Sequence, residues 1–381
     1  MGGHHSWRDG SANVIVLGAC LLAPSIVFSQ GPPANGPAAP PPPVTSEPDP
    51  STTLSPSELD SLAVKQLIIR SNRSPRRLAD MVMRVPPDNP ITEAKAALGR
   101  RLFFDRLLSN DRSVSCASCH DPARAFTDER PLAVGVFGRV GKRHSPSLVN
   151  RGFSRSQFWH GRAATLEALA VQPIPDPNEM DLSLDDAVAR LAADASYRAE
   201  FQTVFERPVS IEDVARALAT YLRTIRSEDS PYDRFVAGDP EALTAQQQLG
   251  LRIFRSKGRC IICHGEPMFT DDVFQNTGVA WRVDPETFTG VYQDQGRFQV
   301  TGLERDRGKF KTPTLREVAR TAPYMHDGSL ATLADVIEFY NTGGRSNPNL
   351  FPLVRPLNLM PDEKQALVAF LESLGGTVTG Q

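Results

Sequence analysis

Two Cys-x-x-Cys-His motifs are the residues of this chain best suited to do chemistry. They read CASCH and CIICH, and they supply Cys116, Cys119, His120, Cys260, Cys263 and His264. Thiols and imidazoles at this spacing serve three kinds of site: zinc, redox disulfides and covalently attached haem. Each alternative makes a different protein.

The spacing of the motifs and their histidines favours haem. A zinc ribbon separates its cysteine pairs by about 15–20 residues, and far more residues intervene between Cys119 and Cys260. Two disulfides leave the histidine after each pair unexplained. In c-type attachment both thiols bind the haem and the adjacent histidine reaches the iron. We therefore predict two covalently bound haem c groups, with His120 and His264 as their proximal ligands.

The sixth position of each iron separates the functions that such a protein can have. An electron carrier fills it on both irons, whereas a peroxidase leaves one iron open, or able to open, for hydrogen peroxide.

The segments before the motifs repeat one pattern. ITEAKAALGRRLFF (residues 91–104) precedes CASCH, and LTAQQQLGLRIF (residues 243–254) precedes CIICH. Both contain L-G-x-R-[L/I]-F with helical periodicity, followed by a short loop. This internal repeat predicts two duplicated helical domains.

The other elements read mostly as helices. Ser210 and Thr332 are predicted to cap two of them, and a third runs from Pro361 to Gly375. Signals for strands are few. We expect a mostly α protein with long functional loops, at residues 121–146 and 265–310.

Composition bounds the class of protein. The chain has 381 residues, which suggests two domains, and 40% of them are hydrophobic. The net charge of −2 gives no indication of nucleic-acid binding. We expect no nucleic-acid partner.

The N-terminus predicts export. Residues 1–29 combine a basic residue, an apolar run and a small-residue cleavage site after Ser29, which is typical of a signal peptide. LGAC, ending at Cys20, offers the alternative of a lipid anchor. Residues 30–58 are rich in proline and predict a disordered tether. We expect a periplasmic protein, bound to a membrane only if Cys20 is lipidated.

Four segments together resemble the bacterial diheme cytochrome c peroxidase and MauG family. They are LGRRLFFDRLLSNDRSVSCASCHDPARAFTD, SPSLVNRGFSRSQFWHGRAATLEALAVQPIPDPNEM, CIICHGEPMFTD and GKFKTPTLREVARTAPYMHDGSLATLADVIEFYNTGG. The resemblance implies two cytochrome-c-like helical domains with one haem each, and an active site near the first haem. We place the first, peroxidatic domain at residues 59–235 and the second, electron-transfer domain at 236–381.

The resemblance also implies roles for single residues. Trp159 matches a tryptophan between the haems that assists electron transfer, and its alternative is a plain core aromatic residue. Glu179 matches the distal acid over the first haem, and its alternative is a surface glutamate. Pro173 matches a distal-pocket proline. Thr321 and Pro323 match residues whose carbonyl oxygens bind a calcium ion between the domains.

Several positions depart from the family pattern. The loop FTDERPLAVGVFGRVG lacks the histidine that caps the first iron in relatives needing reductive activation, so we expect that iron to be open. His144 stands where an asparagine is usual, which puts one calcium ligand in doubt. His160 replaces the usual aspartate, and His326 matches a family histidine expected near a haem edge.

The distal ligand of the second haem has two candidates. Tyr340 matches the family's ligand position and resembles MauG, and Met325 is the rival, with a core tyrosine as the plain alternative. MauG-type chemistry uses a tryptophan beside the second haem. The tryptophans here are Trp7, Trp159 and Trp281, and none directly precedes CIICH.

Three functions follow. The first is a peroxidase that reduces hydrogen peroxide with electrons from a small periplasmic cytochrome c or copper protein. The second is a MauG-like oxidase of a protein substrate, and the third is a diheme electron carrier. Relatives of this family are often dimers, so a homodimer is a further expectation.

Overall fold

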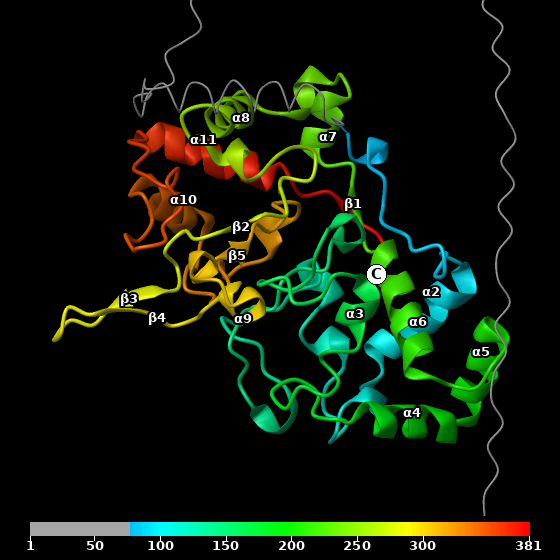
Figure 1. The fold of residues 1–381 in the computed structure, drawn as a ribbon. Helices are drawn as coiled ribbons and strands as arrows, with labels where there is room; N and C mark the ends of the chain where they lie inside the picture. Colours follow the sequence, from blue (N-terminus) through cyan, green and yellow to red (C-terminus); the bar gives the residue numbers. More distant parts are fainter. Residues whose placement is uncertain (1–76) are drawn as a thin grey trace, which may run out of the picture. The chain divides into compact units, whose positions relative to one another are not determined.

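The computed structural model describes residues 77–381, and helices dominate that part of the chain (Figure 1). The expected signal peptide, the lipidation site at Cys20 and the proline-rich tether lie outside the described residues. The helices are α2 (Glu93–Phe104), α3 (Leu166–Ala170), α4 (Leu184–Ala193), α5 (Ala195–Phe205), α6 (Ile211–Thr224), α7 (Pro231–Val236), α8 (Ala245–Arg255), α9 (Phe298–Thr301), α10 (Leu333–Asn341) and α11 (Pro361–Glu372). The prediction of a mostly α fold is confirmed.

The strands in the described residues are short and pair into three antiparallel ribbons. They are β1 (Ser227–Glu228), β2 (Phe274–Gln275), β3 (Trp281–Val283), β4 (Gly290–Tyr292), β5 (Phe310–Lys311) and β6 (Thr377–Val378). The pairs are β1 with β6, β2 with β5 and β3 with β4. The long loop expected at residues 265–310 thus contains a hairpin, β3–β4, which projects from the body in Figure 1.

Helices α2 and α6 form the centre of the first hydrophobic core. Their apolar faces include Leu98, Leu102, Leu218 and Leu222, all buried in one cluster. A side chain on Gly99 would overlap the backbone of α6. The glycine of the repeated L-G-x-R pattern is therefore the point where the two helices approach each other.

The second core repeats this arrangement with α8 and α11. Leu251, Phe254, Leu367 and Phe370 are buried in it. Gly250 is the equivalent glycine, and a side chain there would overlap the backbone of α11. The sequence repeat thus reflects two helix pairs with the same close crossing.

Both predicted helix caps are present in the structure. The Ser210 hydroxyl accepts from the Asp213 amide at 3.2 Å at the start of α6. The Thr332 hydroxyl accepts from the Asp335 amide at 3.1 Å at the start of α10. Such caps satisfy amides that the helix itself leaves unpaired.

The C-terminal residues return to the first core. Strand β6 pairs with β1, and Val378 packs among the residues of the first cluster, whereas Tyr232 on α7 already packs in the second. The Tyr221 hydroxyl donates to the Gly380 carbonyl at 2.8 Å. The domain limits at residues 59–235 and 236–381 stay predictions. Within residues 77–381, no helix is both long and apolar enough to cross a membrane.

Candidate functional site around the two CxxCH motifs

The first motif forms a single helical turn that fixes its histidine. Cys116 begins the turn, and the His120 amide donates to the Cys116 carbonyl at 3.0 Å. The His120 Nδ1 atom lies 3.0 Å from the Phe126 carbonyl oxygen. Because a carbonyl can only accept, Nδ1 carries the proton and Nε2 keeps its lone pair.

The second motif has the same geometry. The His264 amide donates to the Cys260 carbonyl at 2.9 Å, and His264 Nδ1 lies 2.9 Å from the Phe269 carbonyl oxygen. Burial lowers the pKa of both motif histidines. Both are therefore neutral imidazoles with Nε2 available, which is the form that binds a metal.

A second repeat follows each motif and was not recognised in the sequence. Phe126 and Phe269 each begin a Phe-Thr-Asp triplet. Both phenylalanines are fully buried, with φ values of 58° and 52°. This unusual backbone presents their carbonyls to His120 and His264. The repeated FTD triplet is the signal that could have found this contact.

The four thiols are unpaired and neutral. None of the cysteines in the described residues forms a disulfide. Burial raises the pKa of Cys116, Cys260 and Cys263 to about 12 and that of Cys119 to about 11. Residues 77–381 contain no cluster of three or more His, Cys, Asp or Glu side chains that could hold a metal ion.

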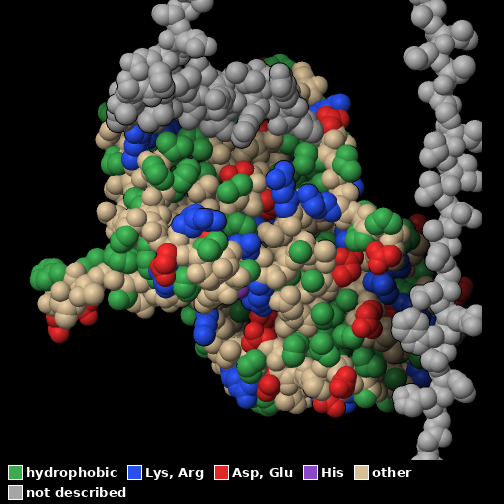
Figure 2. Space-filling view, viewed as in Figure 1, with side chains coloured by type: hydrophobic (Ala, Val, Ile, Leu, Met, Phe, Trp, Pro, Cys, Tyr) green, Lys and Arg blue, Asp and Glu red, His purple; other side chains and the backbone are tan. Residues whose placement is uncertain are grey.

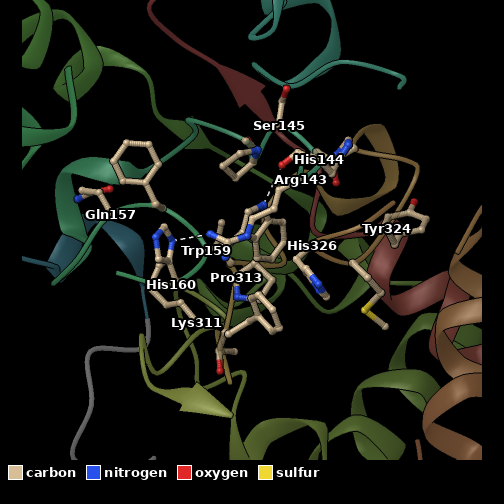
Figure 3. A pocket seen from close by; sticks show the side chains of 18 of the residues that line it. Arg143, His144, Ser145, Gln157, Trp159, His160, Lys311, Pro313, Tyr324 and His326 are labelled. Atoms are coloured by element: carbon tan, nitrogen blue, oxygen red, sulfur yellow. Dashed lines mark hydrogen bonds between the residues drawn. The ribbon is translucent and has the colours of Figure 1, made fainter. Parts of the chain in front are cut away.

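A cavity of about 810 Å³ joins the two motifs (Figure 3). All the predicted site residues line it: Cys116, Cys119, His120, Trp159, Pro173, Glu179, Cys260, Cys263, His264, Thr321, Pro323 and Tyr340. The tertiary structure thus brings together residues from both halves of the chain. Unpaired, partly buried thiols, matched histidine tautomers and a shared cavity fit covalent haem attachment at both motifs.

The loop after the first motif closes over it without offering a ligand. Ala133, Gly135 and Gly141 line the cavity, and the Cys119 thiol lies 3.8 Å from the Val134 carbonyl. A side chain at Gly135 would overlap the backbone at Glu179. Position 135, which lies against the backbone of Glu179, can therefore carry no larger side chain.

Glu179 has the electrostatics of a group that exchanges protons at neutral pH. Burial, together with the neighbouring Asp176 carboxylate, raises its pKa from 4.5 to about 7, against the opposing effect of Arg162. Its backbone is fixed, because the Val136 amide donates to the Glu179 carbonyl at 2.9 Å. Pro173 holds the same segment through a bond from the Met180 amide at 3.2 Å.

Trp159 is fixed from both halves of the chain. Its indole Nε1 donates to the His144 carbonyl at 2.8 Å, and its own carbonyl accepts from the Lys311 amide at 2.7 Å. Figure 3 shows Trp159 between His160 and the side chains near His326. This placement suits a residue between two haem groups, and the role itself stays a prediction.

Tyr340 and Met325 both line the cavity, so the choice of ligand for the second haem stays open. On α10, Leu333 and Ile337 are buried in the second core. Burial and the nearby Cys263 raise the pKa of Tyr340 above its usual value. The proximity of Tyr340 to Cys263 places its phenol beside the second motif.

The predicted calcium site contains oxygen donors but no side chain from His144. Both ring nitrogens of His144 are engaged: Nδ1 lies 2.8 Å from the Arg130 carbonyl and Nε2 lies 3.2 Å from the Thr127 hydroxyl. Thr321 and Pro323 both line the cavity, and the calcium ion itself stays a prediction.

An ion pair across the two halves was missed in the sequence. The Arg143 guanidinium binds Asp294 at 2.7 and 2.8 Å and also donates to His160 Nδ1 at 2.6 Å. Burial and Arg143 lower the pKa of His160 to about 3, so its ring is neutral. The His326 ring stacks on the Phe310 ring, with 3.7 Å between the ring centroids. No local pattern could pair Arg143 with Asp294, because they lie far apart in sequence.

Comparison with known proteins gives one consistent family. The sequence model of the di-haem cytochrome c peroxidases matches residues 93–241. The methylamine utilization protein MauG of Methylorubrum extorquens is 40% identical over 292 residues, which are 76% of this chain and 80% of that protein. The cytochrome c551 peroxidase of Pseudomonas aeruginosa is 34% identical over 290 residues, 75% of this chain and 80% of that protein.

A solved structure agrees with these relatives. The crystal structure of a MauG-like protein associated with microbial copper homeostasis superimposes with a TM-score of 0.69 at 37% identity, covering 77% of this chain and 93% of that chain. The resemblance seen in the sequence is thereby confirmed. The chain belongs to the di-haem cytochrome c peroxidase and MauG family of oxidoreductases, and this membership implies two haem c groups.

Proposed function

We propose that the protein is an exported peroxidase that reduces hydrogen peroxide, with two protons and two electrons, to two molecules of water. The observation that carries this proposal is that the Glu179 carboxyl lines the cavity beside residues 126–141, which contain no histidine. The acid has a pKa of about 7 and lines the cavity of the first motif, and within residues 126–141 the lining residues are Ala133, Gly135 and Gly141.

Cys116 and Cys119 would hold the first haem, with His120 on its iron. When bound, this haem supplies an iron with a free position for peroxide. The hydrogen bond from His120 Nδ1 to the Phe126 carbonyl would leave Nε2 free to bind the iron. The sequence after Phe126, up to Gly141, contains no histidine that would compete for the iron.

Glu179 would move the proton that peroxide cleavage requires. As a carboxylate, Glu179 takes a proton from one oxygen of hydrogen peroxide. As an acid, it returns that proton to the other oxygen, which leaves as water. A pKa close to the working pH suits a group that must do both. Arg162 beside it stabilises the carboxylate form.

The second half would receive the electrons. Cys260, Cys263 and His264 would hold the second haem, and Tyr340, which lines the same cavity, would be a further ligand of its iron. Trp159 lies between the halves and would assist transfer to the first motif. A small periplasmic cytochrome c or copper protein is the proposed donor.

A MauG-like oxidase is the second candidate. The placement of Tyr340 beside Cys263 favours it, and so does the identity of 40% to a protein named MauG. Against it, Arg259 rather than a tryptophan precedes Cys260. We therefore prefer the peroxidase.

Peroxide turnover by the diferric protein tests the proposal. We expect a prompt spectral change without prior reduction, and steady-state turnover with reduced cytochrome c. Glu179→Gln should lower kcat by about 10²–10⁴-fold, whereas Glu206→Gln, on the surface of the same half, should keep it. No spectral change, with both irons low-spin, would rule out both enzyme functions. Protein radicals without turnover would favour the oxidase.

A further inference from the structure

Arg151 is a buried cation with only neutral partners. Its side chain lines the cavity, and the residue is 9% exposed. The guanidinium donates to the Gln157 side-chain oxygen at 3.0 and 2.7 Å and to the Ser156 carbonyl at 2.8 Å. Neither acceptor carries charge, and an arginine stays protonated in proteins.

Lys311 is a second buried basic side chain, close enough to Arg151 for the two charges to interact. It is 5% exposed, lines the cavity, and appears next to Trp159 in Figure 3. Its Nζ lies 3.3 Å from Asp272 Oδ1, while Asp272 Oδ2 accepts from a backbone amide. Burial and the charge of Arg151 lower the pKa of Lys311 to about 7, against Asp272 and, more weakly, Asp271.

Asp272 is bonded to Lys311, whereas no described carboxylate is bonded to Arg151. Asp272 also acts on Arg151 through space, and Asp271 and Asp272 both act on Lys311. Buried charges in proteins are ordinarily paired, and the Arg151 guanidinium has only neutral hydrogen-bond partners. The two basic residues therefore have the character of an anion site that opens into the cavity.

We propose that Arg151 and Lys311 bind a haem propionate at the Trp159 edge of the cavity and raise the reduction potential of that haem. The inference rests on the two bound haems of the proposed function. A propionate is a carboxylate, and a guanidinium with a neighbouring ammonium is suited to bind it. A nearby cation favours the reduced haem, because reduction adds a negative charge.

The site also lies on the proposed electron route. The Lys311 amide donates to the Trp159 carbonyl, and Lys311 precedes the TP segment that lines the cavity near His264. A propionate held here would bring one haem edge next to Trp159. The pair would then both orient that haem and set its potential.

Redox titration of the holoprotein tests the proposal. Arg151→Leu and Lys311→Met should each shift one haem to a lower reduction potential, and the haem that shifts identifies the owner of the propionate. Arg155→Leu and Lys309→Met are the matched controls, because they remove the same charge from residues that do not line the cavity. Equal shifts in variants and controls would overturn the proposal.

Two further arms keep the test decisive. Lys311→Arg retains the charge and should keep the wild-type potential, so a loss of haem or of folding in Lys311→Met can be separated from a charge effect. Inorganic phosphate at constant ionic strength should leave the wild-type potential unchanged; a shift would mean that the site holds a free anion. Potentials are read without peroxide, so a peroxidase that fails to turn over leaves this result intact.

Discussion

The raised pKa of Glu179 makes a prediction about stability as well as about catalysis. The unfolded chain releases this proton near pH 4.5, and the folded chain keeps it until about pH 7. Between these values the unfolded state binds fewer protons, so the free energy of unfolding falls as pH rises. A difference of this size corresponds to about 3 kcal/mol above neutral pH.

Glu179→Gln removes the titrating group while keeping the shape of the side chain. We expect the variant and the wild type to have similar stability at about pH 4, and the variant to be more stable by about 3 kcal/mol at about pH 9. Urea unfolding of the holoprotein at both pH values measures this difference. Glu206→Gln, exposed in the same half, is the control and should show no such dependence on pH.

A neighbouring substitution tests the cause of the shift. Asp176→Asn removes the carboxylate that helps to raise the pKa of Glu179, so the pH range in which stability falls should move downward. The reasoning is refuted if Glu179→Gln gains no stability at high pH, or gains the same amount at both pH values.

Two other predictions concern the second half. Tyr340→Phe should alter the absorption spectrum of the second haem while leaving that of the first haem unchanged. An unaltered spectrum would show that the phenol is not a ligand and would make Met325 the preferred candidate. Gly250→Ala should lower the free energy of unfolding by about 1–3 kcal/mol, because the new methyl group overlaps the backbone of α11. Thermal or urea unfolding measures this loss. An unchanged free energy of unfolding would mean that α8 and α11 move apart to accommodate the methyl group without losing stability.

Much of the fold could be read from local patterns. The L-G-x-R repeat predicted two similar helical units, and its glycines proved to be the contact points of α2 with α6 and of α8 with α11. A helix cap such as Ser210 depends only on residues close by in the chain, so it could be predicted from the sequence. The return of β6 to the first core could not, because it pairs residues 377–378 with residues 227–228, which lie far away in the sequence.

The two CxxCH motifs alone determined the chemistry of this protein, since covalent haem attachment needs only residues that adjoin in sequence. The missing histidine in the first loop was likewise a local observation. Only the tertiary structure decided the electrostatics of the cavity. The pKa of Glu179, the pairing of Arg143 with Asp294 and the burial of Arg151 beside the cavity all arise from the packing of the folded chain. Burial and distance are properties of the folded chain, and no spacing of residues encodes them.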